Sequence, residues 1–480
     1  MALVARASAA RPARLRVGVF ADSRLQPRWI VQALDRVARC GWAEVVAVVA
    51  PQGVFPKNPW WARLDRWAFG SDLCEPVRLA AADSADRVAL DLDVAFALGE
   101  LDDRALDGIA RLGVWRIRAD GAREVANQEP VSGAAITVRL AAGEAPRLAW
   151  ESWGRTYPLS VARNRRELFE RAVELPARAL RDAQRYGGAW LEQRPFAKAD
   201  LPQAAPSLAA VSKRILQRGV EKALYQEQWS LAWRFGALAP DLEGFTRLVP
   251  PPGRNWAHPF ALARGGRYYV FFEDGGRIAM LQVEEGGAWS AARTVLERDY
   301  PLSHPFLLEH EDALYMVPQT ADNGTVELYR CVDFPFLWRL ERVLLEGVRL
   351  ANPTVHRGVD RWWIFAGVGE HELHLFHAPR LSGGEWQPHA RNPVKSDVRS
   401  SRPAGAPYWR NGALYRPAQI NAPRHGAGVA LNRVLRLSAG EYAERQVERI
   451  LPAGDLLGMQ TVNRAGALTV IDFLTRRNRV

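Results

Sequence analysis

A degenerate unit recurs four times in the second half of this chain of 480 residues. Each copy contains a proline, followed by an apolar stretch, a Gly- or Asp-centred turn and an aromatic strand. The copies begin at Ala257-His258-Pro259, Ser303-His304-Pro305, Ala351-Asn352-Pro353 and Ser401-Arg402-Pro403. The prolines are 46, 48 and 50 residues apart, and a weaker fifth copy is expected from Met459 to Ile471. That period, with several short strands in each repeat, is typical of a β-propeller.

The residue before each proline marks the candidate binding site. In a propeller the innermost strands of all blades converge on one central funnel, where a ligand can be enclosed by several blades. The residue before the proline begins that strand, so these residues are predicted to ring the funnel mouth. They are His258, His304, Asn352, Arg402 and, in the fifth copy, Gln460.

The first part of the chain alternates strands and helices. The sequence predicts strands at 15–20, 44–49, 92–98 and 113–117, with helices at 29–38 and 102–111. This order predicts an α/β domain with a doubly wound parallel sheet over residues 15–160. Ala21-Asp22-Ser23 follows the first strand in place of a Gly-rich fingerprint, which disfavours a dinucleotide site.

Segments outside these two domains are predicted to be a tail and a connector. Residues 1–14 are expected to be a disordered tail, and residues 161–226 a helical connector. The connector holds a charged amphipathic helix at 164–184 and a basic amphipathic helix at 207–225. The second helix would lie either on an anionic membrane surface or against its own domain. Gln228–Arg234 alternates as a strand does and is expected to close the propeller, which spans 227–480.

Composition narrows the classes of partner. The net charge of +11 is carried mainly by arginines spread along the chain without a nucleic-acid-binding motif, so no nucleic acid is predicted as a partner. The three cysteines lack metal or redox spacing, and His374 and His377 fall on opposite faces of a predicted strand. We therefore predict no metal and no cofactor. No secretory leader is evident, and we expect a cytoplasmic protein, either free or peripheral at the inner membrane face.

The α/β domain resembles the formyltransferases that use a folate one-carbon donor. Leu98–Trp115 and Val131–Thr137 carry this resemblance over about residues 15–160. The family places an asparagine and a histidine after the Gly-x-x strand, where this chain has Arg116 and Arg118. Every histidine lies at or after His258, and an arginine cannot act as the base of formyl transfer. The resemblance therefore implies a formyltransferase-like domain that has lost its chemistry.

The second half resembles two kinds of five-bladed propeller. It is similar to furanosidase-type glycoside hydrolases, and more closely to the propeller domain of glucosamine inositolphosphorylceramide transferases and their bacterial relatives. The segments that carry this are Tyr268–Glu273, His304–Phe306, Asp333–Pro335, Asn392–Gly405 and Tyr415–Gln419. The resemblance spans about residues 225–475 and implies a propeller that binds or processes carbohydrate.

The chain departs from the hydrolase pattern where that pattern needs carboxylates. Hydrolysis of a glycosidic bond normally uses two of them. Here His258 stands before the blade-one proline, Asn352 occupies blade three, and Gln319 stands where relatives often have glutamate. Glu273, Asp274 and Asp397 remain as candidate acids, with His258 and His304 as candidate bases.

The remaining polar residues suit an anionic sugar ligand. Arginine forks bind phosphate or carboxylate groups, so the candidate substrate contacts are Asn352, Arg399, Arg402, Arg416, Gln419 and Gln460. Alternatively, Arg399 and Arg402 pair with Asp397 in a structural network.

Together these features predict a carbohydrate-active protein of cell-surface glycan or glycolipid biosynthesis. Its ligand would be a sugar nucleotide, a sugar phosphate or a glycan, and it would act as a glycosyl transferase. A non-catalytic scaffold in such a pathway, with a membrane or glycosyltransferase partner, is a second hypothesis. A sugar N-formyltransferase and a glycoside hydrolase are further alternatives.

Overall fold

The computed structural model describes residues 14–50, 72–80, 91–119, 129–197 and 213–478, the last range with gaps before residue 244. The chain divides into two compact units. The first comprises Met1–Ser152 and Thr156–Ser212, and the second comprises Trp153–Arg155 and Lys213–Val480. The predicted tail at 1–14 and most of the predicted helix at 207–225 lie outside the described residues.

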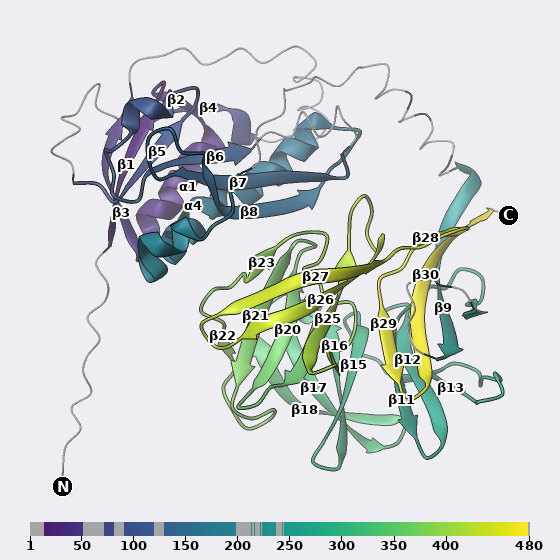
Figure 1. The fold of residues 1–480 in the computed structure, drawn as a ribbon. Helices are drawn as coiled ribbons and strands as arrows, with labels where there is room; N and C mark the ends of the chain where they lie inside the picture. Colours follow the sequence, from purple (N-terminus) through teal and green to yellow (C-terminus); the bar gives the residue numbers. More distant parts are fainter. Residues whose placement is uncertain are drawn as a thin grey trace, which may run out of the picture. The chain divides into compact units, whose positions relative to one another are not determined.

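The first unit is built on a six-stranded sheet (Figure 1). The order is β3-β1-β5-β6-β7-β8, in which β3, β1, β5 and β6 run parallel and β7 is antiparallel to β6. The strands are β1 (Leu15–Ala21), β3 (Ala43–Val49), β5 (Val94–Leu98), β6 (Val114–Ala119), β7 (Val131–Arg139) and β8 (Arg147–Arg155). β2 (Leu25–Pro27) and β4 (Pro76–Arg78) form a separate pair. The strands predicted near residues 15, 44, 92 and 113 are thus confirmed.

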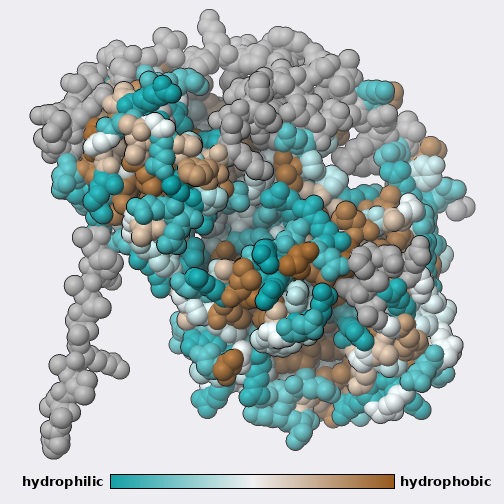
Figure 2. All heavy atoms as spheres, in the orientation of Figure 1, coloured by the Kyte–Doolittle hydropathy of each residue, from teal (hydrophilic) through white to brown (hydrophobic). Residues whose placement is uncertain are grey.

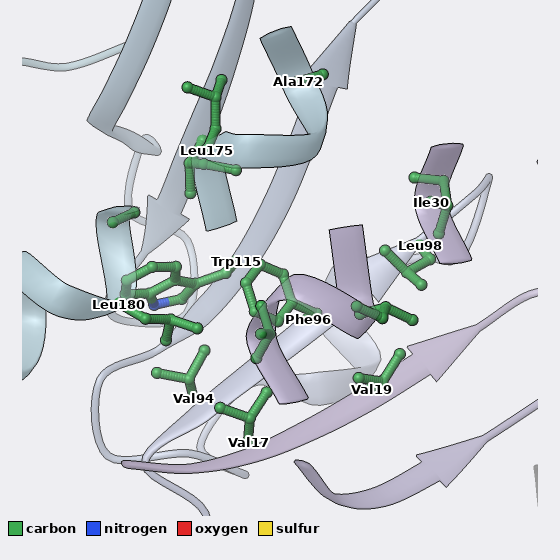
Figure 3. Packing of buried hydrophobic residues seen from close by; sticks show 14 of the residues in the cluster. Val17, Val19, Ile30, Val94, Phe96, Leu98, Trp115, Ala172, Leu175 and Leu180 are labelled. Atoms are coloured by element: carbon green, nitrogen blue, oxygen red, sulfur yellow. The ribbon is translucent and has the colours of Figure 1, made fainter. Parts of the chain in front are cut away.

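Two helices share one core with this sheet. The helix α1 (Arg28–Arg39) buries residues three and four apart, among them Ile30 and Val37, as an amphipathic helix does. The helix α4 (Val161–Glu192) is capped at its N-terminus by Ser160, whose hydroxyl accepts a hydrogen bond from the Arg163 backbone amide. Figure 3 shows Ile30 of α1 and Leu175 and Leu180 of α4 around the strand residues of this core. The amphipathic helix predicted in the connector is therefore part of the first unit.

The opposite face of the sheet carries less helix than the sequence predicts. The expected helix at 102–111 is only a 3-10 helix, η3 (Asp103–Leu106). A second 3-10 helix, η1 (Asp72–Cys74), lies on the other face, where Leu73 packs in the same core as α1. Leu106 packs in a small cluster with Phe20 and Val114. The resemblance to formyltransferases is not confirmed by this sheet and stays a prediction.

The second unit is a five-bladed β-propeller, as predicted (Figure 1). Blade one holds β11 (Trp256–Arg264), β12 (Arg267–Asp274), β13 (Arg277–Val283) and β14 (Arg293–Leu296). Blade two holds β15 (Ser303–His310), β16 (Ala313–Thr320), η4 (Ala321–Asn323), β17 (Thr325–Asp333) and β18 (Leu337–Glu346). Blade three holds β19 (Ala351–Arg357), β20 (Trp362–Val368), β21 (Glu372–Ala378), β22 (Gln387–Pro388) and β23 (Lys395–Ser396). Blade four holds β24 (Tyr408–Arg410), β25 (Ala413–Ile420), β26 (Gly428–Leu437) and β27 (Tyr442–Ile450).

The fifth blade joins the two ends of the propeller sequence. It contains β9 (Tyr225–Phe235) and β10 (Thr246–Leu248) from the start, and β28 (Leu456–Gly458), β29 (Val462–Ala465) and β30 (Leu468–Asn478) from the end. β9 pairs with β30 along its whole length, from Tyr225 opposite Asn478 to Phe235 opposite Leu468. The ring is therefore closed by hydrogen bonds between distant segments, which confirms both the predicted closing strand and the fifth copy of the repeat.

No helix among the described residues is both long enough and apolar enough to cross a bilayer. On the face of the propeller shown in Figure 2, hydrophilic residues surround smaller hydrophobic groups. Isolated exposed apolar residues are normal, so only a concentrated group of them needs an explanation.

Candidate functional site

The residue before the proline sits in a β-bulge in each of blades one to three. The pairing of β11 with β12 jumps between Ala257 and Phe260, and the same jump occurs in the next two blades. His258, His304 and Asn352 have φ values of 53°, 47° and 51°. This left-handed conformation costs roughly 1–2 kcal/mol for a residue other than glycine. Such conformations are frequent at functional sites, and here they recur at the same position of the repeat.

The two histidines lie next to each other and are buried. Their ring centroids are 5.5 Å apart. His258 Nδ1 is 2.9 Å from Thr461 Oγ1, and His304 Nε2 is 3.3 Å from Thr354 Oγ1. Burial holds the pKa of both histidines well below the usual value, and nearby positive charge lowers it further. Both are therefore neutral near pH 7, and their burial disfavours the predicted role of a base that exchanges protons with a substrate.

Arg402 is held in place by Asn352. Its Nε and Nη2 donate to Asn352 Oδ1 at 3.2 and 2.9 Å, and Nη2 also approaches Gln319 Oε1 at 3.5 Å. Gln319 Oε1 in turn accepts a hydrogen bond from the backbone N–H of Asn352 at 2.9 Å. Within the described residues, no hydrogen bond is found at Arg402 Nη1. The half-buried guanidinium thus keeps donors for a ligand while its orientation is fixed.

Two carboxylates from different blades, Glu273 and Glu370, interact electrostatically with Arg402. Burial raises the pKa of Glu273, although Ser303 Oγ donates to it at 2.6 Å and the charge of Arg402 opposes the shift. Glu370 follows β20. Burial alone would raise its pKa, but a hydrogen bond with His425 and nearby arginine charges bring it below the usual value. One carboxyl is therefore shifted towards its protonated form and the other towards its ionised form.

His425 forms a pair with Glu370. Its Nδ1 is 3.3 Å from Glu370 Oε1, and its side chain is 38% exposed. No hydrogen bond is found at Nε2 among the described residues. A carboxylate that holds one ring nitrogen orients the other for proton transfer. His425 therefore has the accessibility that His258 and His304 lack.

Asp472 is a fully buried carboxylate on the closing strand β30. Its oxygens accept the backbone amides of His258, Gln460 and Thr461 at 2.8–2.9 Å. Burial raises its pKa to about 6, although these hydrogen bonds act in the opposite direction. Asp472 thus joins the last blade to the first at the bulge that carries His258.

Two predicted arginine contacts are instead engaged in ion pairs. Arg416 is buried and its Nε and Nη2 donate to the two carboxylate oxygens of Glu444 at 2.9 and 2.7 Å; its guanidinium also donates to the Ser400 and Ser401 carbonyls. The geometry therefore gives Arg416 a structural role in place of the predicted ligand contact. Arg399 pairs with both oxygens of Asp397 at 2.8 Å. The structural alternative thus holds for Arg399 and Asp397, whereas Arg402 pairs with Asn352.

The two predicted glutamine contacts are buried, each with one side-chain atom that lacks a partner. Gln419 Oε1 accepts from Asn421 at 3.3 Å, but its Nε2 has no hydrogen bond in the described part of the chain. Gln460 Oε1 is likewise without a partner there. A buried polar atom without a hydrogen bond costs free energy, so both atoms are suited to a water or ligand group.

Sequence reasoning missed three residues of this region: Glu370, His425 and Asp472. Asp472 could have been found, because a carboxylate inside the apolar run Val470–Leu474 is seldom buried without a structural or functional reason. Glu370 and His425 lie in connections between strands and have no equivalent at the repeat positions. Only the arrangement of the blades brings them to the same end of the propeller.

The family model and the relatives that match this chain carry the same transferase name. Residues 248–455 match the family model described as glucosamine inositolphosphorylceramide transferase 1, N-terminal. A protein of that name from Arabidopsis thaliana is 29% identical over 217 residues, which cover 42% of this chain and 28% of the relative. A relative from Oryza sativa subsp. indica, with the same name, is 29% identical over 211 residues, covering 40% and 28%. The matched part of this chain thus spans about a quarter of the length of these relatives.

Solved structures similar to the chain include glycoside hydrolases. An α-L-arabinofuranosidase from Podospora anserina has a TM-score of 0.37 at 11% identity, covering 52% of this chain and 98% of that one. A family 117 glycoside hydrolase from Zobellia galactanivorans has a TM-score of 0.35 at 10% identity, covering 53% and 91%.

Proposed function

We propose that the propeller binds a carbohydrate ligand and that the chain acts in the assembly of a cell-surface glycan or glycolipid. The binding site would be the central cluster, which we define as Glu273, Gln319, Asn352, Glu370, Arg402 and His425. The match of residues 248–455 to a transferase family supports the pathway, and the polar side chains of the cluster support the ligand class. Sugars are recognised by such arrays of fixed donors and acceptors.

The observation that carries this proposal is the state of Arg402. Asn352 fixes one side of its guanidinium, and Nη1 keeps its donors. Among the arginines predicted as contacts, Arg416 is engaged by Glu444 and Arg399 by Asp397. The cluster therefore suits a ligand with one anionic group, either a carboxylate or a phosphate, beside neutral sugar hydroxyls.

The same cluster offers an acid and a base for glycosyl transfer. Burial raises the pKa of Glu273, which favours its acid form. In that form Glu273 would donate a proton to the oxygen that leaves the donor sugar, while His425 Nε2 would take the proton of the attacking acceptor hydroxyl. Glu370 holds the His425 ring through Nδ1. The bond between the anomeric carbon and the leaving oxygen breaks, and a bond between that carbon and the acceptor oxygen forms. The step is balanced, because one proton is given and one is taken.

Replacing Arg402 tests the binding proposal. A thermal-shift screen of the whole chain would use nucleotide sugars, sugar phosphates, and neutral and acidic oligosaccharides. We expect one sugar class to raise the melting temperature by mass action, and both Arg402→Ala and Arg402→Lys to abolish that shift. Arg247→Ala, which removes an exposed ion pair with Asp455, is the matched control and should keep it.

A screen without any shift, in well-folded protein, would instead support the scaffold hypothesis. A shift that persists in both Arg402 variants would place the ligand elsewhere in the chain.

Replacing Glu273 tests the chemistry separately. With the sugar class found in the screen as donor, Glu273→Gln is expected to lower the turnover of a reconstituted transfer assay about 100-fold or more. Ligand binding should change little, because glutamine keeps the shape of the side chain and can still accept from Ser303. Glu309→Gln, at an exposed position on β15, serves as control. Equal turnover in Glu273→Gln and the parent chain would remove Glu273 as the acid.

A further inference from the structure

The hairpin between β17 and β18 in blade two ends in an apolar turn. The turn residues are Asp333-Phe334-Pro335-Phe336, and the Phe336 amide donates to the Asp333 carbonyl at 2.9 Å. Val332, Phe336 and Leu337 are 46%, 41% and 46% exposed. Turns normally use Gly, Pro, Asn, Asp and Ser, so Phe334 and Phe336 are the unusual residues of this turn. The corresponding turns of blades one and four, Glu284–Gly287 and Ser438–Glu441, contain glycine and no apolar side chain larger than that of alanine.

Four arginines surround this apolar turn. The guanidinium of Arg264 lies 4.7 Å from the centre of the Phe334 ring, and that of Arg293 lies 4.2 Å from the centre of the Phe336 ring. Arg330 and Arg339 are exposed and stand directly opposite each other on β17 and β18. We call these four arginines, with Val332, Phe336 and Leu337, the hairpin patch.

The arginines of the hairpin patch have no carboxylate partner in the described part of the chain. Like charges directly opposite each other on paired strands destabilise a hairpin. An anionic surface outside the chain would therefore relieve the repulsion between Arg330 and Arg339. Asp333 is the one acidic residue of the turn, so positive charge predominates around the exposed apolar side chains.

We propose that the hairpin patch binds an anionic lipid surface, with the side chains of Val332, Phe336 and Leu337 at the boundary of the acyl region. Aromatic and aliphatic side chains flanked by arginines bind membrane interfaces through apolar burial and attraction to anionic headgroups. A protein partner would need a surface both acidic and apolar, whereas an anionic bilayer offers both properties everywhere. This inference stands apart from the ligand of the central cluster and does not depend on it.

Vesicle binding of the full chain tests this proposal. The vesicles are phosphatidylcholine alone or phosphatidylcholine mixed with phosphatidylserine, and binding is measured by co-sedimentation. We expect binding to the mixed vesicles only, and weaker binding at high salt. Arg330→Ala with Arg339→Ala, and separately Phe336→Ser with Leu337→Ser, should each lower the partition coefficient about tenfold or more.

Blade four supplies matched controls. Arg433 and Arg445 are also exposed and directly opposite each other, and Leu435 and Val447 are 51% and 45% exposed. The turn of this hairpin is polar, so Arg433→Ala with Arg445→Ala, and Leu435→Ser with Val447→Ser, should leave vesicle binding nearly unchanged.

Three outcomes would overturn the proposal. These are no binding to either vesicle, binding that persists in the hairpin-patch variants, and an equal loss in the blade-four variants. Every substituted side chain is on the surface, so each variant should remain folded. Near-ultraviolet circular dichroism of each variant checks this.

Discussion

Arg416→Ala is expected to lower the free energy of unfolding of the propeller by about 3–5 kcal/mol. The side chains of Arg416 and Glu444 are only 1% and 3% exposed. Burial alone would raise the pKa of Glu444, but Arg416 and Lys395 hold it at about 2. Removing Arg416 leaves this carboxylate with Lys395 and the Tyr442 hydroxyl in a buried site, and it also frees the Ser400 and Ser401 carbonyls. Urea unfolding followed by tryptophan fluorescence measures the loss.

An exposed pair on the same blade provides the comparison for Arg416. Arg436 and Glu441 are 3.4 Å apart, with side chains 69% and 49% exposed. Arg436→Ala should cost less than about 1 kcal/mol, because solvent screens the pair. If Arg416→Ala cost as little as Arg436→Ala, Arg416 would not be the structural residue that its contacts indicate.

Asp472→Asn is expected to change how the stability of the propeller depends on pH. The pKa of Asp472 is raised from 3.8 to about 6, so the folded state binds its proton more tightly than the unfolded state. Its contribution is therefore fully present below pH 3.8 and is lost as the pH rises through about 6. Between pH 7 and pH 4, the parent chain should gain about 2 kcal/mol relative to the variant.

Comparing the parent chain with Asp472→Asn separates the titration of Asp472 from that of groups with the opposite effect on stability. His258 and His304 have lowered pKa values, so both proteins lose stability as their unfolded histidines take up protons below pH 6.5. That loss is common to the parent and the variant and cancels in the difference. Urea unfolding at several pH values gives the curve, and a difference that stays constant from pH 7 to pH 4 would mean that Asp472 does not titrate there.

The repeat carried most of the propeller fold. Proline spacing and aromatic strands predicted the blades, and the alternation of Gln228–Arg234 predicted the strand that closes the ring. These features are local or periodic, so they can be read without knowledge of distant contacts. The helix at 102–111 was wrong in extent, because a single 3-10 turn suffices to place Leu106 against the sheet.

The candidate site was less predictable, because the role of each residue depends on partners that are far away in the sequence. Arg402 and Arg416 look alike in sequence, yet one is oriented by Asn352 and the other is neutralised by Glu444 on β27. The repeat position placed His258 and His304 at the centre, but their burial follows from packing between blades. Glu370 and His425 come from connections outside the repeat and meet only in the folded propeller.

Hydrogen exchange with and without the sugar found in the screen tests the central claim most directly. The ligand should slow amide exchange in the segments around Glu273, Gln319, Asn352 and Arg402, while residues 15–192 exchange as before. The same experiment on Arg402→Lys should show no such protection. Protection confined to the first unit, or protection of the propeller that survives in Arg402→Lys, would contradict a carbohydrate site at the central cluster.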